Sequence, residues 1–383
     1  MLFKRIVSAI AASALCLSFL TISINADTNK TAVSTASQLM SMKPDGNYYL
    51  VNDIDLTDVK WKSIKNFSGH FDGNGYEITG LTSETYGLFS TLESGAVVEN
   101  VMLTNTYITS KYKTVGGIVS VIQNDTENVT VKDCFVSGVV SSCRTKFKQS
   151  SQGSTAGSIV GKNYSASSFV SNCYSNAVVA SEYTVGGIAG VNYGTIENCG
   201  FGGQIGNVYG IYELKCDENG DAIDDYIYLY CAGGICGIDY GQINNSFSNT
   251  TRRIEIANYY GGIAGALQKR GSIKNCVNSS EVLTDDEGFV CGLIVGYAPK
   301  TSDVSNCYIK ELDSFSVSKG IGKGKKDTTT YIISGENYNK ISSFEKLGSG
   351  WSIVNEVPIL DCLREYVDIA PVYEIKNSSL ITV

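Results

Sequence analysis

Three tyrosines recur at the same place in a repeated pattern and could bind a ligand. The pattern Gly-x-[Asn/Asp]-Tyr ends at Tyr164, Tyr193 and Tyr240. If the segments that carry it stack, the rings and the amides beside them form one row on an outward corner. Aromatic faces pack on sugar rings and amides bond hydroxyls, so this row is our candidate site for a glycan or a peptide. The alternative is an aromatic ladder that only covers a corner.

Carboxylates offer a second chemistry, which we consider less favoured. Polysaccharide lyases and hydrolases need carboxylates about 5 to 9.5 Å apart, or calcium with a basic residue. The carboxylates to test are Asp53, Asp55 and Asp72, but turn geometry explains the segment in which they lie. The regular outward positions of the repeat carry no triplet of Asp. We therefore expect no catalytic residue, with a lyase or hydrolase as the alternative.

The sequence predicts no metal site and no cofactor. A single histidine, His70, excludes His-rich sites and the His-Glu-x-x-His motif. The acidic segment 217–225 could ligate calcium, but Gly220 falls too early for an EF-hand and the closing Glu is missing. We expect a solvated turn there.

Four lysines, Lys319, Lys323, Lys325 and Lys326, alternate with glycines in one segment. This is not a phosphate loop, because Gly-Lys-Ser/Thr is absent. We expect a mobile loop, with contact to an anionic polymer as the alternative.

A repeat positions these residues. One half is a glycine-rich strand such as Val185-Gly186-Gly187-Ile188-Ala189-Gly190. The other half is an aliphatic residue, any residue, Asn or Asp, and a small residue, and its seven copies end at Val101, Cys134, Cys173, Cys199, Ser246, Cys276 and Cys307. Neighbouring copies lie between 26 residues (Cys173 to Cys199) and 47 residues (Cys199 to Ser246) apart. The shortest unit is too short for a propeller blade of about 40 residues, and no helical period appears. Each unit therefore predicts one coil of a parallel β-helix.

Stacking of such coils gives each repeat position a physical role. Equivalent residues lie about 4.8 Å apart along the axis. The seven small residues that end the repeat predict an inward core column. The preceding Asn or Asp can bond a neighbour and tolerate a left-handed backbone. The glycine pairs permit a sharp bend or close approach of adjacent coils.

The chain has 12 cysteines. Because Val101 and Ser246 share the column with five of them, we expect reduced thiols that act as small apolar residues. Disulfides between adjacent coils are the alternative. Cys216 and Cys231 differ, because they flank the acidic turn and form a candidate disulfide across it.

The start of the chain predicts export. Residues 1–5 are basic, 6–24 are apolar and Ala26 is small, as in a secretory signal peptide over residues 1–26. A retained membrane anchor is the alternative. The net charge of −8 argues against nucleic acid as a partner, and we expect no membrane contact beyond the signal peptide.

Together the two halves of the repeat resemble the GLUG motif of secreted and surface-anchored bacterial proteins. The resemblance implies an all-β, right-handed, single-stranded parallel β-helix over residues 48–363, after a cap over 27–47 and before a tail over 364–383. Residues 351–363 resemble the closing strand of such proteins. The resemblance implies a monomeric, adhesin-like binding protein, secreted or at the cell surface, for a glycan or protein ligand. A purely structural spacer is the other alternative.

Overall fold

The computed structural model describes residues 30–370, except 111–113, 124–127, 143–153, 208–228, 251–256, 281–289, 312–318 and 327–329, and the backbone of 373–376 and 379–382. The predicted signal peptide, the acidic segment 217–225 and Cys216 lie outside the described residues.

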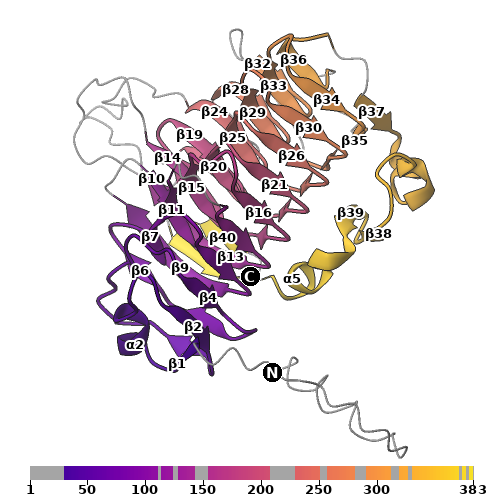
Figure 1. The fold of residues 1–383 in the computed structure, drawn as a ribbon. Helices are drawn as coiled ribbons and strands as arrows, with labels where there is room; N and C mark the ends of the chain where they lie inside the picture. Colours follow the sequence, from indigo (N-terminus) through magenta and orange to yellow (C-terminus); the bar gives the residue numbers. More distant parts are fainter. Residues whose placement is uncertain are drawn as a thin grey trace, which may run out of the picture.

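The fold is a parallel β-helix, as predicted, and strands from successive coils form four long parallel sheets (Figure 1). Sheet A contains β1 (Lys30–Val33), β2 (Asn47–Leu50), β4 (His70–Asp72), β8 (Val97–Glu99), β12 (Thr130–Lys132), β16 (Phe169–Ser171), β21 (Thr195–Glu197), β26 (Gln242–Asn244), β30 (Ser272–Lys274) and β34 (Asp303–Ser305). Sheet B contains β3 (Ile54–Asp55), β5 (Glu77–Thr79), β6 (Thr82–Ser83), β9 (Met102–Ser110), β13 (Phe135–Ser142), β17 (Tyr174–Ser175), β18 (Val178–Ser181), β22 (Gly200–Phe201), β23 (Gln204–Asn207), β27 (Phe247–Ser248), β31 (Val277–Asn278), β35 (Cys307–Lys310) and β37 (Thr330–Ile333). Sheet C contains β7 (Phe89–Leu92), β11 (Val119–Ile122), β15 (Val160–Asn163), β20 (Ala189–Asn192), β25 (Cys236–Asp239), β29 (Ala264–Leu267), β33 (Val295–Ala298) and β36 (Ile321–Gly324). Sheet D contains β10 (Thr114–Gly116), β14 (Thr155–Gly157), β19 (Thr184–Gly186), β24 (Leu229–Gly233), β28 (Ala257–Gly261) and β32 (Val290–Gly292).

One full coil runs through sheets D, C, A and B in that order. The glycine-rich half of the repeat forms the bend from sheet D to sheet C. A Cβ at Gly187 would overlap the Gly234 carbonyl oxygen and the Phe201 ring, so close approach of adjacent coils requires glycine here. The next residue, Ile188, is fully buried in the core.

The predicted core column is present. Residues 102, 135, 174, 200, 247, 277 and 308 pair in register from coil to coil, so the residues before them stack as well. All seven column residues, from Val101 to Cys307, are fully buried. The five cysteines among them are free thiols in this structure.

The Asn/Asp column precedes this core column and has the predicted left-handed backbone. Its seven residues have φ between 46° and 54° and are Asn100, Asp133, Asn172, Asn198, Asn245, Asn275 and Asn306. Several bond the side chain of the coil before rather than its backbone. For example, the Asn198 amide donates to Asn172 Oδ1 at 3.2 Å. This column closes the turn between sheets A and B.

The candidate disulfide between Cys216 and Cys231 is not supported. Cys231 lies in β24 as a free thiol, fully buried against Val191, Ile238 and Ala266 on the outer side of sheets C and D. Its partner in the prediction, Cys216, lies outside the described residues. Strand pairing with Thr184 and Tyr259 embeds Cys231 in sheet D.

The boundaries of the β-helix also differ from the prediction. Parallel pairing already begins at β1, before residue 48, and the short helix α2 (Ala36–Met40) follows it, capped by Thr35. The last parallel strand is β37, well before residue 363. The segment 319–326 is not a loop, because β36 forms the last strand of sheet C.

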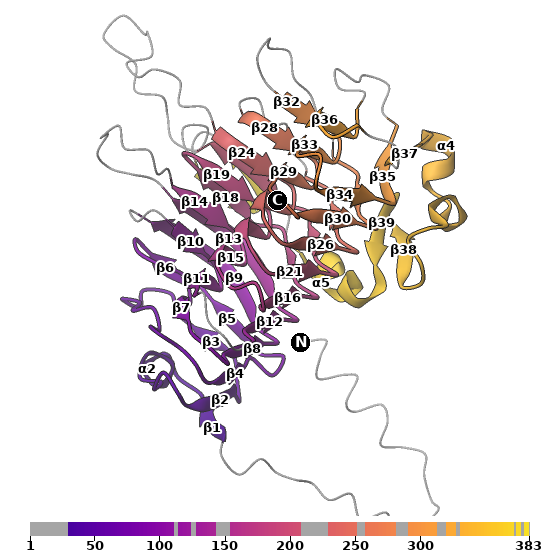
Figure 2. The same ribbon diagram turned by 45° about the horizontal axis from the view of Figure 1, so that its top comes forward.

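Residues 334–370 fold back along the outer face of sheet B instead of closing the coil stack (Figure 2). They form α4 (Gly335–Tyr338), η1 (Ile341–Phe344), the antiparallel hairpin β38 (Trp351–Val354) and β39 (Val357–Leu360), η2 (Asp361–Leu363) and α5 (Arg364–Ile369). A second antiparallel hairpin joins β40 (Tyr373–Lys376) and β41 (Ser379–Thr382). The reason is an apolar outer column on sheet B that includes Phe135, Tyr174 and Phe247, on which Tyr366 and Trp351 pack. The expected closing strand is thus a lateral cover.

Candidate functional site

The three candidate tyrosines lie on one corner of the β-helix, directly after strands of sheet C. The backbone amides of Tyr193 and Tyr240 donate to the carbonyl oxygens of Asn163 and Asn192 in the coil before, at 3.1 and 2.7 Å. Tyr164 makes the equivalent bond to Ile122 at 3.0 Å. The structure therefore brings Tyr164, Tyr193 and Tyr240 into a single row, which we call the tyrosine row.

The rings of the tyrosine row contact one another. The centroids of Tyr193 and Tyr240 are 4.2 Å apart, with planes only 5° from parallel, and Tyr164 is 6.0 Å from Tyr193 with a tilt of 40°. Tyr164 and Tyr240 remain 40% and 36% exposed. Tyr193 and Tyr240 each cover one face of the other ring, so those two faces are closed to a ligand. A ligand can still reach the ring edges, the hydroxyls and the outer faces of the row.

Burial and the neighbouring hydroxyls of Tyr240 and Tyr164 raise the pKa of Tyr193 to about 12. Tyr193 is therefore uncharged at neutral pH. A tyrosine hydroxyl can both donate and accept a hydrogen bond.

The amides of the pattern do not face outward, which corrects our expectation that they would bond a ligand. Asn163, Asn192 and Asp239 are fully buried and form an inward ladder under the tyrosine row. The Asn163 amide donates to Asn192 Oδ1 at 2.8 Å, and the Asn192 amide donates to Asp239 Oδ1 at 2.7 Å. Adjacent residues in a strand point to opposite sides, so an outward Tyr requires an inward residue before it. The ladder fixes the corner rather than contacting a ligand.

Asp239 ends this ladder in an unfavourable environment. Its Oδ2 is buried and has no hydrogen-bond partner in the described part of the chain. Burial raises the pKa of Asp239 to about 7, although hydrogen bonds from Asn192 and from the Gly241 amide oppose the shift. This carboxyl is therefore protonated more readily than an ordinary aspartate.

The carboxylates considered for catalysis accept hydrogen bonds from backbone amides. Asp53 accepts from the Glu77 amide at 3.0 Å, and Asp72 accepts from the Asn74 amide at 2.8 Å. Asp55 accepts from the Thr57 amide at 2.8 Å, and hydrogen bonds from Thr57 lower its pKa. Asp55 and Asp72 bond amides two residues ahead, as in turns, whereas Asp53 bonds an amide of the next coil. Each of the three carboxylates thus has a structural hydrogen bond.

Sequence reasoning missed one ionic cluster on the outer face of sheet A. His70 Nε2 lies 2.6 Å from Glu99 Oε1, and Lys132 Nζ lies 2.8 Å from Glu99 Oε2. Although burial opposes it, bonding to Lys132 and His70 leaves the pKa of Glu99 lowered. The three residues come from β4, β8 and β12, so only the register of the coils could have revealed the contact.

Within the described ranges, no group of three or more His, Cys, Asp or Glu could hold a metal ion. In the same part of the chain, no helix is long and apolar enough to cross a membrane.

Comparison with known proteins supports the fold and leaves the family open. No family model matches the chain. A protein of Evansella cellulosilytica named "Putative Gly-rich membrane protein" is 40% identical over 16% of this chain, and the match spans only 9% of that protein's length.

Two solved structures share the architecture. One is described as a putative immunoglobulin A1 protease from Bacteroides ovatus, with a TM-score of 0.53, 21% identity, and coverage of 88% of this chain and 93% of that chain. The other is named IgA1 Protease, with a TM-score of 0.53, 15% identity, and coverage of 84% of this chain and 24% of that one. At these identities the similarity demonstrates a common β-helix fold.

Proposed function

We propose that this chain is an exported, non-catalytic and adhesin-like binding protein that recognises a glycan or a protein at the cell exterior. The observation that carries the proposal is the tyrosine row, a partly exposed set of stacked rings on a corner held by an internal hydrogen-bonded ladder. Tyrosine combines an apolar ring with a polar hydroxyl, which suits both sugars and peptides. A rigid support lowers the entropy lost when a ligand binds.

The test compares two variants of the purified protein on a glycan and host-protein array. Tyr164→Ala with Tyr240→Ala removes the two most exposed rings of the row. Each ring contributes about 0.5–1.5 kcal/mol, so removing two rings should lower the affinity by about 5-fold to 150-fold. The matched control is Tyr107→Ala, because Tyr107 is 46% exposed on β9 of sheet B, outside the row.

The thermal unfolding temperature serves as the folding control, and both variants should stay close to the wild type. Equal binding by the wild type and the double variant would refute the role of the row. Absence of binding to the whole array would favour a structural spacer.

A second candidate is hydrolysis, which one specific observation favours. His70 and Glu99 are residue types that serve as general acids and bases, they lie 2.6 Å apart, and both solved neighbours carry the name of a protease. Incubation with immunoglobulin A1 and with acidic and neutral polysaccharides, followed by detection of new termini or reducing ends, tests it. Cleavage that disappears in His70→Ala would replace the binding proposal with catalysis.

A further inference from the structure

The corner that carries the tyrosine row continues to the last coil. The residue directly after each later strand of sheet C is Gln268, then Pro299, then Lys325. The amides of Gln268 and Lys325 donate to the carbonyl oxygens of Asp239 and Ala298 in the coil before, as the tyrosines do. Lys325 therefore lies three coils beyond Tyr240, about 14 Å at roughly 4.8 Å per coil.

The neighbouring outward position of sheet C follows the same path. From coil to coil it passes through Val191, Ile238, Ala266 and Tyr297 and ends at Lys323. Val191, Ile238 and Ala266 form an apolar cluster against which Tyr193 and Tyr297 pack. The corner thus changes from aromatic and apolar to basic as it reaches the end of the β-helix.

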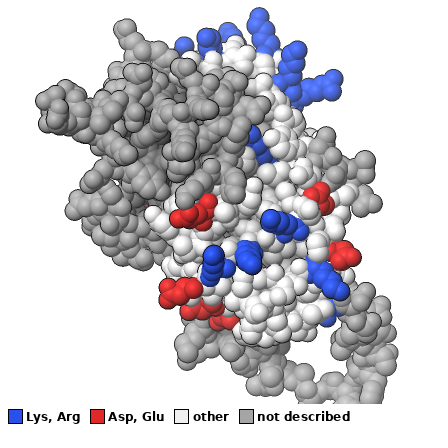
Figure 3. Space-filling view, turned by 90° about the vertical axis from the view of Figure 1, so that its left-hand side faces the viewer, with Lys and Arg blue, Asp and Glu red and all other residues white. Residues whose placement is uncertain are grey.

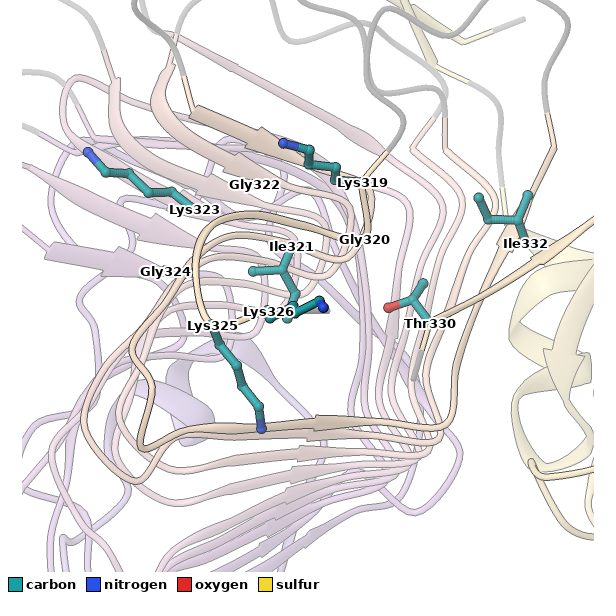
Figure 4. A pocket seen from close by; sticks show the side chains of 10 residues that line it. All are labelled: Lys319, Gly320, Ile321, Gly322, Lys323, Gly324, Lys325, Lys326, Thr330 and Ile332. Carbon is teal, nitrogen blue, oxygen red and sulfur yellow. The ribbon is translucent and has the colours of Figure 1, made fainter. Parts of the chain in front are cut away.

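At that end the last coil encloses an open cavity of about 640 Å³. It is lined by Ile321, Thr330 and Ile332, by three glycines of β36 and its flanks, and by the lysines Lys319, Lys323, Lys325 and Lys326. Figure 4 shows Ile321 and Lys326 pointing into the opening, whereas Lys323 points away from the coil. We call these four lysines and the cavity the basic end.

Within the described part of the chain, the charge of the basic end is largely uncompensated. Lys325 Nζ donates to the Ser302 carbonyl at 2.8 Å and lies 4.0 Å from an Asp303 oxygen. Among the described residues, no carboxylate oxygen lies within 4.0 Å of Lys319, Lys323 or Lys326. In Figure 3, Lys and Arg side chains gather at the top of the face, the end at which Figure 1 places β36. Four cations here contrast with a net charge of −8 for the whole chain.

We propose that the ligand is an acidic polysaccharide that lies along this corner, with anionic groups bound at the basic end. This inference rests on the proposed function of the tyrosine row and specifies its ligand class. The ring edges and hydroxyls of the row contact the sugar chain, and Lys319, Lys323 and Lys326 neutralise its carboxylates or sulfates.

The direction of the corner favours a polysaccharide over an extended peptide. A ligand along the corner crosses the strands of sheet C, each of which pairs with the coils on both sides until β36. A peptide would therefore find a free strand edge only at the final strand, whereas binding by strand addition needs such an edge along its length.

The ring stacking leaves fewer open aromatic faces on which the bases of a single-stranded nucleic acid could stack. Tyr193 and Tyr240 occupy each other's faces at 4.2 Å. The negative net charge of the chain also opposes binding of a nucleic acid.

The experiment measures binding of the purified protein to immobilised polygalacturonate, with its methyl-esterified, uncharged form as the ligand control. The test variant is Lys319→Gln with Lys323→Gln and Lys326→Gln, and it leaves the structural Lys325 intact. The matched control is Lys60→Gln with Lys62→Gln and Lys65→Gln, which removes three exposed lysines at the opposite end of the coils. Polyphosphate, poly-glutamate and single-stranded DNA are the competing probes.

The wild type should prefer the charged polymer, and added salt should weaken that binding. The test variant should lose at least about tenfold in affinity for polygalacturonate and little for the esterified form, whereas the control variant should stay within about twofold. Tyr164→Ala with Tyr240→Ala should weaken binding of both forms.

Each other outcome overturns a defined part of the account. If the tyrosine variant loses binding and the lysine variant does not, the row binds glycans but the basic end takes no part. If only the lysine variant loses binding, the continuous corner is wrong. If both lysine variants lose affinity equally, the attraction is non-specific. Stronger competition by DNA, polyphosphate or poly-glutamate than by free polygalacturonate would refute the acidic polysaccharide.

Discussion

Replacing Asp239 by Asn should remove a specific pH dependence of stability. In the preceding coil, the Asn192 amide donates to the Gly194 carbonyl at 2.9 Å, while Asn192 Oδ1 accepts from the Gly194 amide at 3.1 Å. Asp239 occupies the same position one coil later and accepts from the Gly241 amide, but its Oδ2 has no donor in the described structure. An amide at position 239 can donate to the Gly241 carbonyl and complete the ladder.

The magnitude follows from the pKa of Asp239. Burial raises it from 3.8 to about 7, so between these values the folded state binds a proton that the unfolded state has released. The contribution of the protonated Asp239 to the free energy of unfolding is fully present below pH 3.8 and is lost as the pH rises through about 7. A shift of about three units, at about 1.4 kcal/mol per unit, gives a loss of up to about 4 kcal/mol at pH 8.

The assay is urea unfolding of the wild type and Asp239→Asn at several pH values from 4 to 8. The variant should match the wild type within about 1 kcal/mol at pH 4 and exceed it by up to about 4 kcal/mol at pH 8. The control is Asp45→Asn, because Asp45 is exposed near the start of the coils. A constant difference between Asp239→Asn and wild type across this range, or a less stable variant at pH 8, would refute the reasoning.

Two further predictions concern the stacked columns. Cys199→Ser should lower the free energy of unfolding in urea by no more than about 1 kcal/mol, because Ser246 occupies the same column in the next coil and bonds the Asn244 carbonyl at 2.8 Å. Cys199→Leu should lower it by about 1–3 kcal/mol, because the larger side chain overpacks the column. A leucine tolerated at no cost would contradict a tight column. Asn198→Ala should lower the free energy of unfolding by about 1–2 kcal/mol, because the backbone at this position is left-handed with φ of 53°. Asn198→Gly should lower it less. Equal losses in the two variants would show that the left-handed backbone is not the cause.

The repeat made the fold and the tyrosine row predictable. Because chemically similar residues recur at one position in seven coils, a column follows from the sequence without knowledge of any contact. The same rule placed Cys173 and Cys199 in the core and Tyr193 beside Tyr240.

Features that depend on neighbouring columns could not be predicted from the motif alone. The contact between His70 and Glu99 joins residues two positions apart along the pleat, so it depends on the register of two coils. The lateral cover around Trp351 depends on the apolar outer column of sheet B, in which Phe135, Tyr174 and Tyr308 follow the motif rather than belong to it. The lysine segment was misassigned because four lysines interrupt the apolar pattern that marks the other glycine-rich strands.

A crystal structure of the protein with a galacturonate tetramer would show whether the corner binds an acidic polysaccharide. We expect sugar rings against the tyrosine row or its extension past Gln268, with a ligand carboxylate within about 4 Å of Lys323 or Lys326. A tetramer bound on another face, with this corner empty, would contradict it.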